Sequence, residues 1–297
     1  MAVGRVVLVA GVLILLFIPY LLWGTGLITA HNQALLRTQF AIDQVRSGAP
    51  TTSHLSAPPH GTTPLTAHPA PIVADPAVGT PVGAIIIPKI GLSMIVVEGT
   101  GVPQLQAGPG HYPSTPLPGE AGNAAIAGHR TTYLHPFYNL NELVPGDPIT
   151  IETVQGIFLY DVTSSMAVLP TDVAVVDPTP TPTLTLTTCN PRYSASQRLV
   201  VHAALVASVL AHPKGGVTPV VPQVPRTQSV VVTPQHDWLA AILWGVGVIA
   251  LTTAIWIGAR RTRRCWRGLE IGLGIGVWLV VVFFFFQSVA PLLPASY

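Results

Sequence analysis

The chain has 297 residues, of which 49% are hydrophobic and only 9% are charged, and its mean hydropathy is +0.54. These values are too apolar for an ordinary soluble protein and direct attention to membrane segments. Eight basic and ten acidic side chains lie between residues 30 and 236. They form no basic patch, so we expect no nucleic-acid partner.

Three apolar segments are each close to the roughly 20 residues that an α-helix needs to cross a bilayer. They run over residues 6–23, 238–257 and 269–289. The first is longer than the apolar part of a secretory signal peptide, which spans about 7 to 15 residues. We therefore interpret residues 1–30 as a retained N-terminal anchor, and residues 237–258 and 269–290 as two further transmembrane helices.

The loop at residues 259–268 carries five arginines. Because arginine-rich loops next to membrane spans stay in the cytoplasm, we expect this loop and the N-terminus inside the cell. Residues 30–236 and the tail at 291–297 are then expected outside.

The two cysteines, Cys189 and Cys265, would lie on opposite sides of the membrane and could not form a disulfide. We interpret Cys265 as a spare thiol in the cytoplasmic loop. A lone thiol outside the cell, at Cys189, points to chemistry. The alternative is a buried cysteine that acts as a small hydrophobic residue.

Composition divides the external part into a folded domain and its connections. Residues 31–48 have weak helical periodicity and predict a juxtamembrane helix. Residues 49–81, rich in Pro, Thr, Ala and His, and residues 212–236 predict extended linkers. The linker histidines His54, His60 and His68 are not spaced like metal ligands. No acidic cluster suggests a calcium site, so we expect no metal or other cofactor.

Residues 82–211 are the expected folded domain. Short apolar or alternating runs between Pro and Gly breakers predict seven strands. These are residues 83–87, 94–98, 124–127, 148–153, 157–163, 183–188 and 199–206, with one short helix at 136–143. Many short strands with few helices indicate a mainly β fold, either a closed barrel or a sandwich.

Cys189 ends the alternating run TLTLTTC, whose period of two places Leu on one face and Thr and Cys on the other. Arg198 opens the next strand nine residues later, so a thiol and a permanent cation are expected at neighbouring strand ends. His129 follows the run NAAIAG, in which Gly128 is expected to let the backbone turn sharply.

These three residue types suit acyl transfer by a thiol. Cys189 would be the nucleophile, because a nearby base or cation increases the thiolate fraction. His129 would exchange protons with the departing and incoming amines. Arg198 keeps its charge and would bind substrate carbonyls or the oxyanion. Each residue alone also has a structural explanation, as a small core thiol, a strand-cap histidine or a surface arginine.

Other polar residues flank the proposed site. Thr188, Tyr193 and Ser194 are candidates for lining a peptide groove, although Thr188 is equally well explained as a strand residue. The sequence does not identify an acidic partner of His129 among four candidates. These are Glu98, Glu120, Asp147 and Asp161.

Segments of this domain resemble the sortase family. They are GAIIIPKIGLSMIVVEGT at its start, GHYPSTPLPGEAGNAAIAGHRTTYLHPFYNLNELVPGD around His129 and TLTTCNPRYSASQRLVV around Cys189. The resemblance covers residues 82–206 and is greatest to the class E sortases of high-GC Gram-positive bacteria. Asn190, directly after the cysteine, departs from some relatives.

The resemblance implies an eight-stranded sortase β-barrel and a membrane-anchored cysteine transpeptidase with Cys189, His129 and Arg198 as its catalytic residues. Such an enzyme would cleave an LPXTG-like or LAXTG-like sorting signal after Thr, through a thioacyl intermediate. Its partners would be sorting-signal surface proteins, a peptidoglycan precursor amine and the plasma membrane of a Gram-positive bacterium.

Two other functions are weighed against this one. The first is a catalytically idle, membrane-tethered barrel that acts as a binding or scaffold module. The second is a cell-wall enzyme of the L,D-transpeptidase type. That family resembles this chain poorly, because its cysteine lies in a Ser-His-Gly-Cys-like setting.

Overall fold

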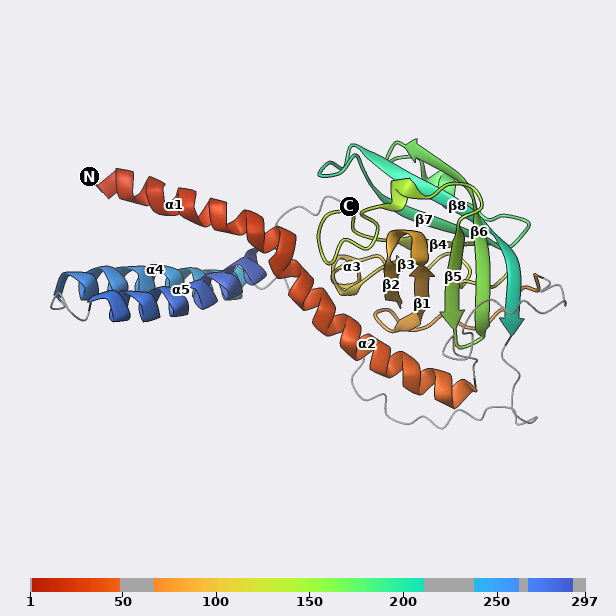
Figure 1. Cartoon of the computed structure of the whole chain (residues 1–297), viewed down its shortest axis with the longest axis horizontal. Helices are drawn as coiled ribbons and strands as arrows, with labels where there is room; N and C mark the ends of the chain where they lie inside the picture. Colours follow the sequence, from red (N-terminus) through yellow and green to blue (C-terminus); the bar gives the residue numbers. More distant parts are fainter. Residues whose placement is uncertain (1, 49–66, 211–237, 262–266, 291–297) are drawn as a thin grey trace. The chain divides into compact units, whose positions relative to one another are not determined.

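Eight strands form a closed barrel in the order β1-β2-β3-β4-β7-β8-β6-β5 (Figure 1). Their bounds are β1 Pro81–Ile87, β2 Leu92–Glu98, β3 Gly110–His111, β4 Asn123–Ala127, β5 Pro148–Thr153, β6 Gly156–Val168, β7 Thr183–Asn190 and β8 Gln197–Leu210. Neighbouring strands are antiparallel except β2 with β3 and β4 with β7, which are parallel. The expected closed barrel is confirmed, and the sandwich is wrong.

The structure is a computed structural model that describes residues 2–48, 67–210, 238–261 and 267–290. The chain divides into two units. Of the described residues, one unit comprises 2–25, 238–261 and 267–290, and the other comprises 26–48 and 67–210. The second unit contains the barrel.

The alternation in β7 shows how the sequence builds the barrel wall. Leu184 and Leu186 are fully buried in the hydrophobic core that the strands enclose. Thr185 points to the other face, as its position predicts, but it is also fully buried. Its hydroxyl donates to Asn123 Oδ1 at 2.6 Å and lies 2.9 Å from His202 Nδ1. The outer face of this strand is therefore covered by polar side chains.

Several short elements differ from the sequence predictions. Strand β3 has only two residues and the helix α3, Val102–Ala107, has six, so neither spans enough residues to give a periodic signal. Strands β6 and β8 are longer than expected and pair with each other along most of their length. The second half of β6 is mostly exposed, so its sequence shows no apolar alternation that would predict a strand. The helix expected at residues 136–143 is wrong, since only Leu140–Glu142 forms a 3-10 turn.

The helix α2, Thr25–Ser47, packs from Gly26 onward on the outside of the barrel. Leu36 and Phe40 form a buried hydrophobic cluster together with Ile95 and Val97 of β2. Gln33, 3% exposed, donates through Nε2 to the carbonyls of Ile95 and Ala107, at 2.9 and 3.0 Å. Its Oε1 accepts from the Ile95 N–H at 2.8 Å.

The Gln33 amide thus takes the place of a neighbouring strand at Ile95, because β3 pairs only with Val97 and Glu98 of β2. This contact also requires a glycine at position 108. A Cβ atom there would lie 2.3 Å from Gln33 Nε2. The side chain therefore reaches the sheet edge only because Gly108 leaves the space open.

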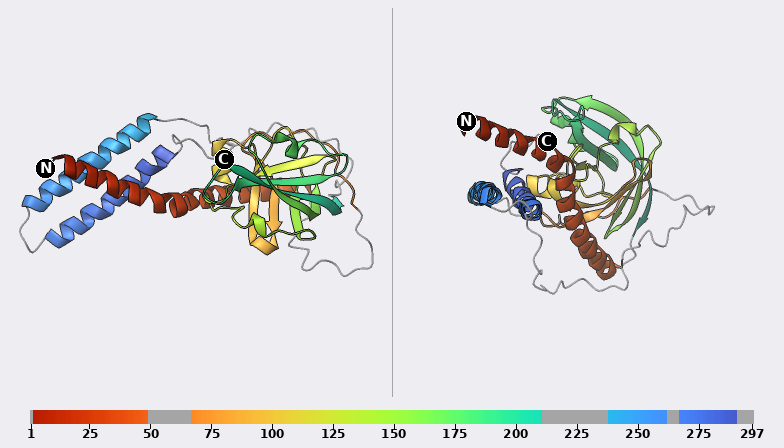
Figure 2. Two further views of the ribbon diagram at one scale, coloured as in Figure 1. Left: turned by 90° about the horizontal axis from the view of Figure 1, so that it is seen from above. Right: turned by 60° about the vertical axis from the view of Figure 1, so that its left-hand side comes forward.

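The other unit contains long apolar helices. They are α1 Ala2–Pro19, the π-helical turn Tyr20–Gly24, α4 Trp238–Arg261 and α5 Arg267–Val289. Helices α4 and α5 lie side by side (Figure 2), and Trp278 Nε1 donates to Thr252 Oγ1 at 2.8 Å. Tyr20 packs in a cluster with Val248, Val282 and Phe286.

Three helices among the described residues are long and apolar enough to cross a membrane. They cover residues 11–47, 238–258 and 272–289. The expectation of three hydrophobic helices is therefore confirmed. Several predicted segments lie wholly or largely outside the described residues. They are the linkers expected at 49–81 and 212–236, the arginine loop with Cys265, and the tail at 291–297.

We expect Gln33→Ala to weaken the docking of α2, because it leaves buried main-chain groups of Ile95 and Ala107 without partners. The cost should be about 1–3 kcal/mol of local stability. Hydrogen–deuterium exchange of the full-length protein should show faster exchange in β2. Gln44→Ala is the matched control, since Gln44 is a buried glutamine of the same helix whose Nε2 makes no hydrogen bond among the described residues. Equal exchange in both variants would contradict the role of Gln33.

Candidate active site

Cys189 and Arg198 are direct neighbours across two antiparallel strands. Cys189 is the penultimate residue of β7, and its Cα partner in β8 is Arg198. Paired residues of an antiparallel ladder project to the same face of the sheet. The thiol and the guanidinium therefore lie on one face of the barrel wall, at adjacent strand ends.

His129 reaches the same level through the parallel pairing of β4 with β7. Ala127 pairs with Thr187, and the Gly128 N–H donates to the Thr187 carbonyl at 3.1 Å. The Thr188 hydroxyl donates to the Gly128 carbonyl at 2.7 Å. His129 lies two residues after the end of β4, and Cys189 lies two residues after Thr187, the β7 partner of the last β4 residue. The three predicted residues therefore come from β4, β7 and β8 or directly after them, and these strands are neighbours in the barrel.

Gly128 is required by packing against an aromatic ring. A Cβ atom at this position would lie 2.6 Å from Cδ2 of Phe137, which is fully buried. Its φ angle is not in the left-handed region that favours glycine. Left-handed backbone freedom is therefore not what requires glycine here; it is needed because the Phe137 ring packs against the backbone before His129.

Burial disfavours charge on both proposed reactive groups. It lowers the pKa of His129 from 6.5 to about 4. The pKa of Cys189 is raised, because burial outweighs the opposing charges of Arg198 and Arg130. At neutral pH the resting site therefore holds a neutral imidazole and a neutral thiol, with permanent cations next to the sulfur.

Arg198 keeps part of its guanidinium available. Its Nη1 donates to the main-chain carbonyls of Ala195 and Gln197, at 3.1 and 3.2 Å. None of the ion pairs found among the described residues involves Arg198. The side chain is thus held by the β7–β8 loop and retains donors for an oxyanion or a peptide carbonyl.

Arg130 is a residue that sequence reasoning missed. It is 6% exposed, and its Nη1 donates to the Cys189 carbonyl at 2.9 Å and to Asn190 Oδ1 at 2.7 Å. Its Nη2 donates to Asn141 Oδ1 at 2.9 Å. Its position directly after His129 was the only available signal, because its partners are a main-chain carbonyl and two neutral amides.

Tyr133 packs against the proposed general acid and base. Its ring centroid lies 4.8 Å from that of His129, and its hydroxyl accepts a hydrogen bond from Gln106 Nε2 at 3.0 Å. Tyr133, Leu134 and His135 all have positive φ angles. The segment after His129 therefore folds back so that an aromatic ring covers the imidazole.

The three groove candidates have different surroundings. Thr188 is 4% exposed and its hydroxyl is bonded to the Gly128 carbonyl. Tyr193 is 71% exposed, with a positive φ angle. Ser194 Oγ donates to Ser196 Oγ at 3.2 Å. Of the three, Tyr193 is the most accessible to a peptide.

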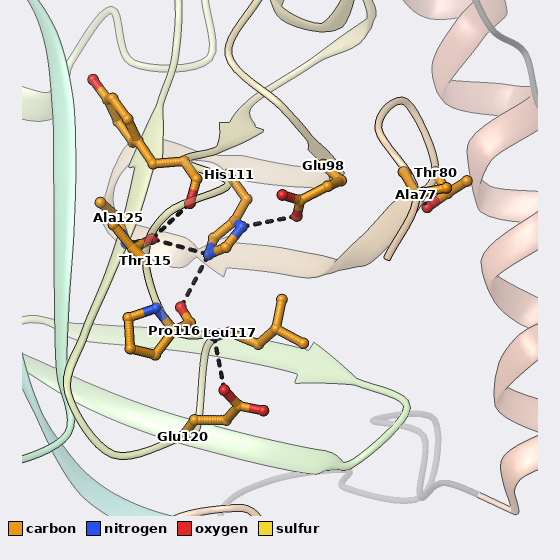
Figure 3. Close-up of polar contacts among 10 residues, drawn as sticks. Ala77, Thr80, Glu98, His111, Thr115, Pro116, Leu117, Glu120 and Ala125 are labelled. Carbon is orange, nitrogen blue, oxygen red and sulfur yellow. Dashed lines mark hydrogen bonds and ion pairs between the residues drawn. The ribbon is translucent and has the colours of Figure 1, made fainter. Parts of the chain in front are cut away.

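Three of the four candidate carboxylates are held elsewhere. Glu98 Oε2 lies 2.8 Å from Nδ1 of His111, whose Nε2 lies 3.0 Å from the Pro116 carbonyl (Figure 3). Glu120 accepts the main-chain N–H groups of Val73 and Leu117. Asp147 forms an ion pair with Lys89 at 2.7 Å. The fourth, Asp161, lies on β6.

The buried His111 joins strands and loop on one side of the barrel. It is fully buried on β3, Glu98 is 1% exposed on β2, and Thr115 and Pro116 belong to the loop that leads to β4. This cluster fixes β3 although the strand has only two residues. Among the described residues, no group of three or more His, Cys, Asp or Glu side chains is arranged to hold a metal ion.

The fold and the site define a closed β-barrel that carries a thiol, an imidazole and a guanidinium at adjacent strand ends. Residues 85–206 match the family model of the Sortase domain. These residues, which include His129, Cys189 and Arg198, therefore form a sortase domain.

Named relatives agree with this assignment. Sortase SrtE1 of Streptomyces coelicolor is 31% identical over 221 residues, which cover 69% of this chain and 56% of the relative. Sortase D of Bacillus subtilis is 33% identical over 101 residues, covering 34% and 50%. The chain thus spans about half the length of each of these relatives. Sortase SrtE2 of S. coelicolor is 28% identical, covering 68% and 80%.

Solved structures with similar sequences include the crystal structure of S. coelicolor sortase E1 with a tripeptide in the active site. It is 32% identical, and the match covers 44% of this chain and 91% of that chain, with a TM-score of 0.43. Sortase E of Streptomyces avermitilis is 38% identical, covering 46% and 93%, with a TM-score of 0.42.

We expect His129 to titrate far below an ordinary histidine, because its imidazolium form would lose hydration in the folded barrel. NMR titration of protein with isotope-labelled histidine should give a midpoint near 4. His129→Gln identifies the signal by its disappearance. A midpoint close to 6.5 would contradict the burial of this ring.

Proposed function

We propose that this chain is a membrane-anchored cysteine transpeptidase that cleaves a sorting signal and transfers the protein to a cell-wall amine. The observation that supports this proposal is that His129 follows the end of β4, while Cys189 lies on β7 and Arg198 on β8, and these three strands are neighbours in a sortase domain. An LPXTG-like or LAXTG-like signal is the proposed substrate, and a peptidoglycan precursor is the proposed amine.

In the first half of the reaction, Cys189 Sγ attacks the Thr carbonyl carbon of the signal. The thiol proton moves to His129, whose neutral imidazole accepts it. The Thr–Gly bond breaks as His129 passes this proton to the departing Gly amine. The protein is now held as a thioester on Cys189, and Arg198 stabilises the oxyanion that forms before the bond breaks.

In the second half, the acceptor amine attacks the thioester carbonyl carbon. His129 takes a proton from this amine and returns it to the sulfur as the new amide forms. No proton is gained or lost by the site over the full cycle. A neutral thiol with a neutral imidazole suits this sequence, because the pair holds the one proton that must be moved.

Substrate contacts are proposed for the loop between β7 and β8. We propose that Tyr193 and Ser194 line a peptide groove beside Cys189 and that Thr188 supports this groove from the strand. The exposed Tyr193 ring supplies a large apolar surface for an extended peptide.

The proposed organisation places the barrel, residues 82–211, outside the cell between two linkers. The N-terminus and the arginine loop at 259–268 lie in the cytoplasm. Substrate and enzyme are then tethered to the same membrane, which raises their effective concentration for each other.

We expect Cys189→Ala to abolish transfer, because no thioester can form. Incubation of the full-length protein with a fluorogenic sorting-signal peptide and an amine should show turnover reduced by about 10³-fold or more. Mass spectrometry of the unmodified protein should detect the thioester on Cys189. Cys265→Ala is the matched control and should retain turnover. Full turnover of Cys189→Ala would exclude the assigned nucleophile, and an idle barrel would show neither turnover nor thioester.

The proposed topology predicts opposite labelling of the two thiols. In intact spheroplasts, a membrane-impermeant maleimide should label Cys189 in the Cys265→Ala variant. In the Cys189→Ala variant, Cys265 should be labelled only after the membrane is permeabilised. Labelling of Cys265 in intact spheroplasts would show that the arginine loop lies outside.

A further inference from the structure

Arg130 holds the main chain of the proposed nucleophile. One guanidinium nitrogen donates both to the Cys189 carbonyl and to the side chain of the next residue, Asn190. The second terminal nitrogen donates to Asn141. A planar guanidinium bound at three acceptors fixes its partners more closely than a single-donor group would.

The positive charge of Arg130 is buried without a carboxylate partner. The ion pairs among the described residues are Arg46 with Asp43, Lys89 with Asp147, and His111 with Glu98. The acceptors around Arg130 are instead a main-chain carbonyl and two neutral Asn amides. Burying a cation in this way is costly, and little solvent is present to screen its field.

Asparagine in place of aspartate is the informative choice at positions 141 and 190. An Asp carboxylate would hold the guanidinium equally well and would also cancel its charge. The amides provide the hydrogen bonds while the charge remains effective at Cys189. A purely structural clamp has no need for this arrangement.

Arg192 strengthens the positive potential of the same region. Its Nη2 donates to Asn139 Oδ1 at 3.1 Å and to Asn141 Oδ1 at 3.3 Å, so Asn141 binds two guanidinium groups. Its Cζ lies 4.1 Å from the centroid of the Tyr138 ring. The charged and titratable groups on the strands and loops around Cys189 include Tyr112, His129, Arg130, Tyr133, His135, Tyr138, Glu142, Arg192, Tyr193, Arg198 and His202.

We propose that Arg130 is a positioning residue of the active site, which orients Cys189 through its main chain and supplies a second positive charge, besides Arg198, that stabilises the thiolate. This inference rests on the proposed role of Cys189 as nucleophile. Arg130 acts through Cys189 and does not touch the reacting carbonyl.

Thiol titration tests this role without any substrate. The rate of Cys189 alkylation by iodoacetamide is measured against pH in the full-length Cys265→Ala protein, so that one thiol is followed. Arg130→Gln should raise the midpoint by about one pH unit, because a neighbouring opposite charge favours the thiolate. Arg130→Lys keeps a charge and should shift it less. Arg46→Gln, at an exposed arginine of α2, should leave it unchanged.

Asn141→Asp gives the sharper measurement. This variant keeps an oxygen acceptor for Arg130 and adds a carboxylate, so it should raise the midpoint while the fold is retained. Asn141→Asp also provides the test of the electrostatic role if Arg130→Gln fails to fold. An unchanged midpoint in Asn141→Asp would overturn the electrostatic role and leave Arg130 as a structural clamp.

Peptide transfer by the same variants separates this inference from the proposed function. Arg130→Gln should lower kcat more than it changes KM, because it acts on the thiolate rather than on peptide binding. Absence of transfer by the unsubstituted protein, with the midpoint shifts present, would reject the transpeptidase and keep the charge effect. Transfer by the unsubstituted protein, with no midpoint shift in the variants, would keep the transpeptidase and reject the charge effect of Arg130.

Discussion

The parallel pairing of β4 with β7 is the constraint on which the site depends. Parallel strands end at the same edge of a sheet, so residues that follow their ends lie at one level. Gly128 and Thr188 fix this register through two hydrogen bonds, and antiparallel β8 then places Arg198 opposite Cys189. A slip of one residue would turn each side chain to the other face of the wall. Strand register therefore positions the proposed chemistry.

The electrostatic balance at this edge follows from burial and from uncompensated arginines. Burial favours the neutral forms of Cys189 and His129, whereas the guanidinium groups favour negative charge on sulfur. The site thus rests without charge on its reactive pair, in surroundings already oriented toward the charge that would develop during attack. Such preorganisation requires no rearrangement of solvent at the moment of reaction.

The sequence predicted the parts of the site that depend on local spacing. Cys189 and Arg198 were expected at neighbouring ends because a short loop joins antiparallel strands. His129 follows a strand whose parallel partner is about sixty residues away, and periodicity does not reveal such a pairing. The sequence linked His129 to Cys189 by residue type and by the family resemblance, and not by a predicted strand pairing. Arg130 escaped notice because its partners are neutral and distant in sequence. Gly128 was explained by backbone freedom, whereas the Phe137 ring is what requires it.

The Gln33 contact has a consequence for neighbouring copies of the molecule. A strand edge with unpaired main-chain groups is a template for intermolecular β-pairing and aggregation. The amide of Gln33 occupies that template at Ile95, and the apolar side chains of α2 cover the surface beside it. The helix α2 therefore also protects the barrel against aggregation, because a barrel without it would expose an unpaired strand edge to other copies of the chain.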